Sequence, residues 1–281
     1  MKKTNRLLSI LLVLLLLCTS IPLAFASTVA SGTCGENLTW TLDDAGTLTI
    51  SGTGKMWNRP WNDLYTDQIK SVVISEGVTS IAKAAFINCS NLRSVTIPNS
   101  VSKIGSSAFY GCSKLERVTI PYGITSIEPT TFSACHKLAS VSIPNTVTTI
   151  GRSAFWACES LTSVVIPDSV TTIGDDAFWQ CLNLTNLSLG NSINSIGEEA
   201  FKSCPLTTVT IPSGVENIAK NAFSRCESFN VNPGNPYYSS DTSGCLYNKE
   251  KTILLKYPIG NSRTSFVVPN TVKRIENYAF Y

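Results

Sequence analysis

A phenylalanine returns at a fixed interval through most of this chain. The interval is 23 residues between the first six copies and 22 residues before the seventh. The seven positions are Phe86, Phe109, Phe132, Phe155, Phe178, Phe201 and Phe223. A period of this length indicates a repeat architecture, in which each copy is one small structural unit stacked on the next. The repeat therefore constrains the fold of this chain much more than it constrains the ligand.

The chain opens with the composition of a secretory signal peptide, residues 1–26. Basic residues between Lys2 and Arg6 precede an apolar run at 7–17, and Ala24-Phe25-Ala26 supplies the small residues that a signal peptidase accepts. We expect cleavage after Ala26. The apolar run is about half of the ~20 residues that a helix needs to cross a bilayer, and no later run is longer. The sequence thus predicts a secreted, extracellular or cell-surface protein without a membrane span.

Removal of this segment changes the charge of the protein. The whole chain has 22 Lys and Arg against 19 Asp and Glu, and residues 1–26 hold three basic and no acidic residues, which leaves 19 of each sign. The mature protein is formally neutral. The basic footprint of a nucleic-acid binder or of a polybasic membrane binder is therefore missing, and we expect neither kind of partner.

The repeat from Leu92 to Cys112 shows the layout of one coil. Apolar residues alternate with Ser94 and Thr96 up to Pro98, which predicts a short strand ended by a turn. A second short apolar pair follows, and Ala-Phe-x-x-Cys then places its apolar side chains as one helical or 3₁₀ turn would. The inward positions are Leu92, Val95, Ile97, Val101, Ile104, Ala108, Phe109 and Cys112. The inward residues of one coil are too few to stabilise a fold alone. The coils must therefore stack.

The inward positions keep their size from copy to copy. The first strand carries Leu-x-x-Val-x-Ile in most copies, and Leu184, Leu187 and Leu189 take these places in one copy. Such volume-conserving exchange is what a close-packed column tolerates. We therefore expect a mainly β solenoid of stacked 23-residue coils, whose first strands form a parallel sheet at a spacing of ~4.8 Å and whose second strands are short.

The repeat pattern L-x-x-V-x-I-P-x-x-V-x-x-I-G-x-x-A-F-x-x-C resembles the BspA-type leucine-rich repeat of bacterial surface antigens, from about Ile69 to the end of the chain. Eight Ala-Phe or Thr-Phe pairs recur in register. Their phenylalanines are Phe86, Phe109, Phe132, Phe155, Phe178, Phe201, Phe223 and Phe280. Departures are local, since Gly190 replaces the turn proline, Glu128 and Glu276 replace glycine, and Thr131 replaces alanine. The resemblance implies a leucine-rich repeat solenoid that binds extracellular partners.

Two further segments resemble pieces that accompany this family. Residues 34–50 alternate apolar and polar side chains around Asp43-Asp44-Ala45-Gly46, which predicts a β-hairpin that covers the first coil. Residues 232–255 resemble a hairpin insertion within the array. We therefore divide the chain into a signal peptide at 1–26, an N-terminal β-hairpin cap at 27–68, a leucine-rich repeat array at 69–228, a β-hairpin insertion at 229–262 and a resumed, incomplete repeat at 263–281.

Nine cysteines remain after signal removal, and seven of them fall at one inward position of successive coils. These seven, which we call the thiol row, are Cys89, Cys112, Cys135, Cys158, Cys181, Cys204 and Cys226. Cysteine serves there as a small buried hydrophobe, so we expect free thiols. Disulfides between cysteines of neighbouring coils are the alternative, because the coil spacing falls within the Cα–Cα range that a disulfide spans. Cys34 and Cys245 lie outside the row and are the better candidates for redox pairing.

The sequence offers little support for catalysis or for a metal. There is one histidine, His136, and no Cys-x-x-Cys pair, and a straight row of thiols does not make a tetrahedral site. His136 follows Cys135 directly, but adjacent residues on a tight coil point in different directions, so a Cys-His dyad is disfavoured. No phosphate loop, zinc motif or nucleophile elbow occurs. We expect no enzyme activity, no cofactor and no metal.

Two exposed surfaces could bind a partner. The outward positions of the first strands are rich in Ser and Thr and poor in aromatic anchors. The position after each phenylalanine is richer, because it holds Tyr110, Trp156 and Trp179, and the two tryptophans should lie on adjacent coils. These three residues are our candidate binding residues. The alternative is that the two tryptophans shield the edge of the core.

The resemblance implies an adhesin-like binding module that contacts an extracellular protein or polysaccharide without turnover. The chain stops at Tyr281, before the cysteine and the next strand of its last repeat, so we also expect that it is part of a longer protein. Two alternatives stay open. The repeats could be the recognition portion of a secreted enzyme whose catalytic domain lies elsewhere, or a structural spacer without a ligand.

Overall fold

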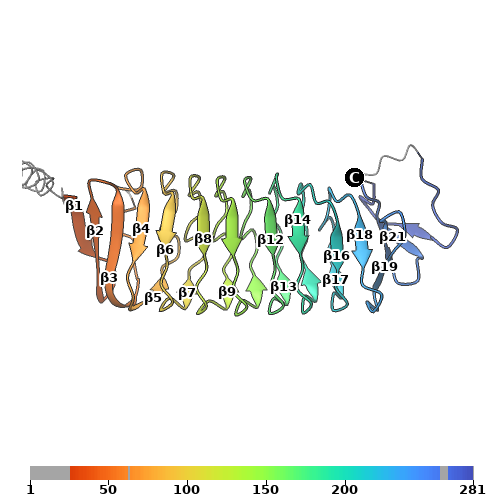
Figure 1. Cartoon of the computed structure of the whole chain (residues 1–281), viewed down its shortest axis with the longest axis horizontal. Helices are drawn as coiled ribbons and strands as arrows, with labels where there is room; N and C mark the ends of the chain where they lie inside the picture. The colour runs from red at the N-terminus through yellow and green to blue at the C-terminus, as the bar shows by residue number, and fades with distance from the viewer. Residues whose placement is uncertain (1–25, 63, 260–264, 281) are drawn as a thin grey trace, which may run out of the picture.

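The computed structural model describes residues 26–62, 64–259 and 265–280. Within these residues the chain forms an elongated solenoid, and the strands of successive coils lie side by side along its length (Figure 1). The predicted solenoid of stacked, mainly β coils is confirmed. Apart from Ala26, the predicted signal peptide lies outside the described residues.

The first strands of the coils are parallel and in register. They pair two by two, β4 with β6, β8 with β10, β12 with β14 and β16 with β18, and Val72 lies opposite Val95 as Val118 lies opposite Val141. Figure 1 shows them as one row of arrows across the solenoid. Their bounds are Ser71–Ile74 (β4), Ser94–Thr96 (β6), Arg117–Thr119 (β8), Ser140–Ser142 (β10), Ser163–Val165 (β12), Asn186–Ser188 (β14), Val209–Ile211 (β16) and Phe229–Val231 (β18).

The second strands form another parallel ladder. β5 pairs with β7, and β9, β11, β13, β15 and β17 form one continuous sheet, in which Ile150 lies opposite both Ile127 and Ile173. Their bounds are Val78–Ile81 (β5), Lys103–Ile104 (β7), Ser126–Ile127 (β9), Thr149–Ile150 (β11), Thr172–Ile173 (β13), Ser195–Ile196 (β15) and Asn217–Ile218 (β17). The short second strands predicted from the apolar pair are confirmed.

The helical or 3₁₀ turn predicted around each phenylalanine is absent from the described residues, which contain no helix. The segment is a run of β-turns in which alternate N–H groups serve different partners. Around Phe109, three N–H groups donate to carbonyls three residues earlier. The three that alternate with them, those of Ser107, Phe109 and Gly111, donate to the next coil at 2.9–3.1 Å. We call this second set, repeated from coil to coil, the turn ladder.

The turn ladder explains why the helical prediction was wrong. A helical turn directs every N–H along its own chain, whereas here every second N–H must reach a neighbouring coil. The backbone achieves this by left-handed residues on either side of the phenylalanine, such as Ser107 at φ +57° and Gly111 at φ +72°. Ala84 and Asn221 hold the same place as Ser107, at φ +54° and +57°. Non-glycine residues adopt this region only where the surrounding structure compels them.

The core is a column of phenylalanine rings, as predicted. From Phe86 to Phe223 each ring stacks on the next at centroid distances of 5.1–5.4 Å, and Phe109, Phe132 and Phe155 are fully buried. Sequence analysis missed the first member of this column, Trp61. Its ring stacks on Phe86 at 5.7 Å. Its Nε1 donates to the carbonyl of Ala85 at 2.8 Å, so it occupies the place of a phenylalanine at the N-terminal end.

The predicted N-terminal hairpin is confirmed and is joined by a third strand. β1 pairs with β2 and β2 with β3, all antiparallel, and β3 then pairs in parallel with β4. Leu38, Trp40 and Leu42 of β2 are buried and alternate with exposed residues, so one face of the sheet covers the first coil. The bounds are Thr28–Thr33 (β1), Asn37–Asp43 (β2) and Thr47–Lys55 (β3).

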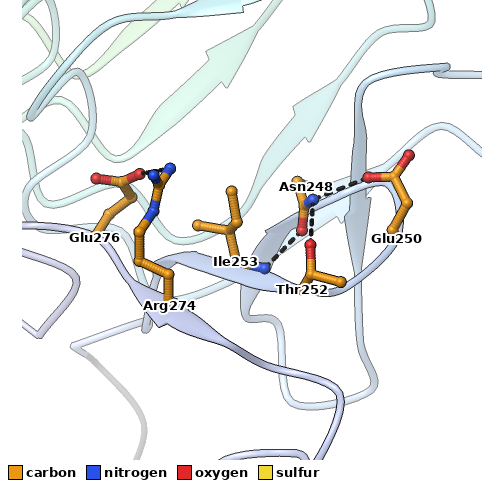
Figure 2. A network of polar contacts seen from close by, with 6 residues as sticks. All are labelled: Asn248, Glu250, Thr252, Ile253, Arg274 and Glu276. Atoms are coloured by element: carbon orange, nitrogen blue, oxygen red, sulfur yellow. Dashed lines mark hydrogen bonds and ion pairs between the residues drawn. The ribbon is translucent and has the colours of Figure 1, made fainter.

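A second small sheet lies at the C-terminal end. β19, β20 and β21 are antiparallel, and β21 pairs in parallel with β22 of the resumed repeat. Asn248 organises the turn between β20 and β21, because its side chain accepts from the N–H of Ile253 at 2.7 Å and donates to Glu250 and Thr252 at 2.9 Å (Figure 2). The bounds are Tyr238–Ser240 (β19), Leu246–Asn248 (β20), Ile253–Lys256 (β21) and Arg274–Ile275 (β22).

Asn235 attaches this sheet to the last regular coil. Its side chain is fully buried, and its Nδ2 donates to the carbonyls of Pro212 and Val215 at 2.8 and 3.0 Å. Its Oδ1 accepts from the N–H groups of Tyr237 and Tyr238, both at 2.8 Å. All four hydrogen-bonding positions of the amide are therefore used.

We expect Asn235→Leu to lower the free energy of unfolding by about 2–4 kcal/mol, because the four hydrogen bonds of a fully buried amide are lost. Chemical denaturation measures this loss. Asn232→Leu is the matched control, since the Asn232 side chain accepts one exposed hydrogen bond, from the N–H of Gly234. Equal losses in the two variants would contradict the role of Asn235.

Candidate binding surface

Trp156 and Trp179 lie on adjacent coils and contact each other. Their ring centroids are 6.1 Å apart at an interplanar angle of 39°, and both side chains are partly buried. The Nε1 atom of Trp156 is buried and finds no acceptor among the described residues, so part of this ring faces the core edge. The exposed remainder of the two rings forms a small apolar surface, which we call the tryptophan pair.

Lys202 extends the tryptophan pair by one coil. Its Nζ lies 5.2 Å from the centroid of the Trp179 ring and 2.8 Å from Oε1 of Glu199. A cation over an indole face is attracted by the ring quadrupole, so the ammonium group is held beside the pair. The sequence signal was the position of Lys202 directly after Phe201, which is the place that Trp179 holds one coil earlier.

Tyr110 is separated from the tryptophan pair. It lies two coils before Trp156, and the coil between them carries the fully buried Ser133 at the same position. The Oγ of Ser133 donates to the carbonyl of Ser153, inside the solenoid. The structure therefore brings two of the three candidate residues together and leaves Tyr110, itself partly buried, apart from them.

The outward face of the first strands is exposed and hydroxylic, as the sequence indicated. Ser94, Thr96, Thr119 and Ser142 are exposed, and Val165 is the largest apolar interruption at 69% exposure. Single exposed apolar residues are normal on protein surfaces. This face therefore lacks the clustered aromatic anchors that mark a strong binding site.

All nine cysteines of the described residues are buried, and none of them forms a disulfide. In the thiol row, the Sγ of each cysteine from Cys112 to Cys204 donates to the carbonyl of the phenylalanine one coil earlier, at 3.1–3.3 Å. Burial raises the pKa of Cys89 and of Cys226 to about 12. The thiols of the row therefore serve packing and hydrogen bonding.

Cys34 and Cys245, which we considered for redox pairing, cannot pair with each other. Both are buried and form no disulfide, and they lie next to the N-terminal and C-terminal sheets, at opposite ends of the solenoid (Figure 1). Burial raises the pKa of Cys34 to about 11, so this thiol is protonated at neutral pH. A low-pKa, accessible thiol is the usual mark of a redox cysteine, and Cys34 has the opposite properties.

His136 and Cys135 point apart. The thiol of Cys135 donates to the carbonyl of Phe109 at 3.3 Å, whereas Nδ1 of His136 lies 3.3 Å from Oε1 of Glu159 on the next coil. The pair cannot act as nucleophile and base because the thiol is committed to the core. Within residues 26–62, 64–259 and 265–280, no cluster of His, Cys, Asp and Glu has a metal-binding arrangement.

The amino-acid sequence of the chain matches the model of a known protein family. The model of the BspA type leucine rich repeat region, six copies long, matches residues 64–185 and 148–249, which together make up more than half of the chain. The chain belongs to the BspA-type leucine-rich repeat family. No curated protein sequence matches this BspA-type chain.

Solved structures similar to the BspA-type chain are bacterial repeat and surface proteins. A leucine rich cell surface protein from Faecalibacterium prausnitzii is 28% identical with a TM-score of 0.59, over 90% of this chain and 68% of that one. The pneumococcal vaccine antigen PcpA shares the fold at 20% identity and a TM-score of 0.58, and the match covers 91% of this chain and 62% of PcpA. A leucine-rich repeat protein from Eubacterium ventriosum is 26% identical with a TM-score of 0.44, and the match covers 90% of this chain and 57% of that protein.

The BspA-type chain therefore spans between 57% and 68% of the length of these three structures. The similar proteins are repeat proteins and are not described as enzymes. None of the described residues of this chain belongs to a helix with the length and hydrophobicity that crossing a bilayer requires.

Proposed function

We propose that this chain is a non-enzymatic, adhesin-like binding module of a secreted or cell-surface protein, and that it contacts an extracellular protein or polysaccharide. The observation that carries the proposal is the tryptophan pair, with two indole rings 6.1 Å apart at the surface of an otherwise hydroxylic solenoid. The proposal also keeps the predicted division of the chain, with the signal at 1–26 and the array at 69–228.

The geometry of the tryptophan pair suits a flat or apolar ligand surface. Indole rings offer a large contact area with little loss of conformational entropy, because only two torsions are ordered. The solenoid adds rigidity, since backbone hydrogen bonds of the paired strands and of the turn ladder join neighbouring coils. Lys202 beside Trp179 supplies one cation for an acceptor or a carboxylate of the partner.

We expect the Trp156→Ala/Trp179→Ala double variant to lose at least about tenfold in affinity for its partner, because truncation of two central aromatic anchors typically costs 2 kcal/mol or more. Binding is measured on arrays of glycans and of extracellular matrix proteins, which also separate the two partner classes. Circular dichroism and the denaturation midpoint report whether the fold is kept.

Tyr122→Ala is the matched control for this double variant. Tyr122 is 68% exposed in a turn before the second strand of its coil, away from the tryptophan pair, so its loss should leave binding unchanged. A double variant that keeps both its fold and its binding would show that the two rings only shield the core edge.

A further inference from the structure

A cavity of about 290 Å³ lies where the regular array meets the resumed repeat. One wall is the turn segment 219–223 of the last regular coil, and the opposite wall is the corresponding segment 276–278. Phe229, Leu246 and Leu255 line it between these walls. Its size is at the lower end of the range of ligand pockets, and its lining combines apolar side chains with a few polar groups.

The turn ladder stops at this cavity. Its last regular bonds run from the N–H of Glu199 to the carbonyl of Lys220 at 3.1 Å, and from the N–H of Phe201 to the carbonyl of Ala222 at 2.8 Å. The next two donors are the N–H groups of Asn221 and Phe223. Among the residues that the structure describes, neither has an acceptor.

The resumed repeat does not supply these acceptors because the C-terminal sheet has taken its place. By register, the carbonyl of Ala279 would accept from Phe223. Instead it accepts from the N–H of Tyr257 at 2.7 Å. The segments 219–223 and 276–278, which would be neighbours in an uninterrupted array, therefore line the cavity without a turn-ladder bond between them.

The side chain of Asn221 adds an acceptor on the same wall. Its Oδ1 is buried and has no donor among the described residues. Buried polar groups of a native protein are nearly always paired, so an unpaired acceptor next to two unpaired donors calls for a partner. Together, this wall offers two N–H donors and one carbonyl acceptor, which is the complement of a peptide backbone.

The opposite wall is polar. Lys256 is 7% exposed, and its Nζ donates to the carbonyl of Tyr278 at 2.9 Å. Burial lowers the pKa of Lys256 to about 8, so the amine stays mainly charged at neutral pH. Glu276 is held by an ion pair with Arg274 at 2.5 Å (Figure 2). The wall thus keeps both a cation and an anion in place.

We propose that this cavity binds a short peptide segment of a partner protein, whose main-chain carbonyls accept from the N–H groups of Asn221 and Phe223. The donors are two residues apart, as in every earlier coil, where carbonyls two residues apart accept from them. A main-chain N–H of the peptide donates to Oδ1 of Asn221, and its side chains contact Phe229, Leu246 and Leu255. The mode is an addition to an open backbone edge.

This cavity is distinct from the tryptophan pair, because its wall at 219–223 lies two coils beyond the coil of Phe178 and Trp179. Failure of one proposal therefore leaves the other intact. A tryptophan double variant should bind the peptide as the unchanged protein does, and a variant of Asn221 should keep the binding ascribed to the tryptophan pair.

The test is a titration of the ¹⁵N-labelled protein with an acetylated and amidated Arg-Ser-Ala-Phe peptide. This peptide copies residues 152–155, whose backbone supplies carbonyls to the coil before it. We expect saturable shifts of the Asn221 and Phe223 amide signals and an exchange with solvent at least about tenfold slower. The amides of Glu199 and Phe201, already bonded, should not change. Absence of saturable change at millimolar peptide would overturn the proposal.

Two further arms separate the peptide from other ligands. Asn221→Ala should weaken peptide binding about fivefold or more, since one buried hydrogen bond is lost. Alanine is accommodated at this left-handed position, which Ala84 holds in the first coil. Ser153→Ala, at the same left-handed position three coils earlier, is the control, and equal affinity of both variants would overturn the role of Oδ1. Shifts with N-acetylglucosamine oligomers but not with the peptide would assign the cavity to glycans.

Discussion

Replacing Phe155 with alanine is expected to lower the free energy of unfolding by about 3–5 kcal/mol. The ring is fully buried between Phe132 at 5.4 Å and Phe178 at 5.1 Å, so its removal opens a cavity with aromatic walls. A solenoid cannot relax around this cavity without breaking the strand ladders on both sides. Urea denaturation followed by tryptophan fluorescence measures the loss.

The matched control is Phe280→Ala, the same substitution at the end of the solenoid. Phe280 is 52% exposed and stacks on no ring of the central column, although it contacts Tyr257 at 5.2 Å. We expect less than about half of the loss seen for Phe155, because the surface that it buries is correspondingly smaller. A loss below about 1 kcal/mol for Phe155→Ala would contradict the continuous core column.

The second large effect is a steep loss of stability in alkaline solution. Burial raises the pKa of six thiols of the row above the ordinary 9.0, to about 12 for Cys89 and Cys226. Between pH 9 and the folded pKa, the unfolded thiol loses its proton while the folded one keeps it. Stability therefore falls as pH rises, by about 1.4 kcal/mol per pH unit for each thiol.

The combined loss of stability from six such thiols would exceed the free energy of unfolding of a typical domain, ~5–15 kcal/mol, within about two pH units. We expect cooperative unfolding between about pH 9.5 and 11 in the presence of a reductant, measured by circular dichroism. Lys256 has the opposite effect. Its pKa is lowered from 10.5 to about 8 in the folded state, so the free energy of unfolding rises with pH between these two values. One amine cannot offset six thiols.

A variant with Cys135, Cys158 and Cys181 changed to alanine is the control for this alkaline transition. It removes half of the six thiols, so the slope of unfolding free energy against pH above 9 should fall by about half. The slope is the readout, since the cavities lower the stability at every pH. A stability that stays constant up to pH 11 would show that the row is accessible to solvent or ionised.

The central column could be predicted because repetition makes packing visible in a single sequence. Phe109, Phe132 and Phe155 recur at one interval, and the residues around them change by no more than about a methylene group, so only a shared interior fits. Trp61 was missed because it lies outside this interval, 25 residues before Phe86 and in a segment without the Ala-Phe pattern. Its indole N–H also needed a partner that only the fold supplies, the carbonyl of Ala85.

The turn conformation could not be predicted for a different reason. Left-handed residues are usually recognised by glycine, but here Ser107, Ser153 and Asp176 take this conformation at φ +52° to +57°. What compels them is the hydrogen bond from each of these residues to the next coil, which is a contact between positions about 22 residues apart. No local preference of serine or aspartate contains that information.

The amino-acid sequence by itself determined the period, the inward face, the thiol row and the adjacency of Trp156 and Trp179, because each follows from the spacing of side chains along a repeated coil. Only the tertiary structure decided the turn ladder, the place of Trp61 and the cavity beside Asn221. These depend on which backbone groups find partners in neighbouring coils, and an interruption of the stack changes those partners without changing the repeat itself.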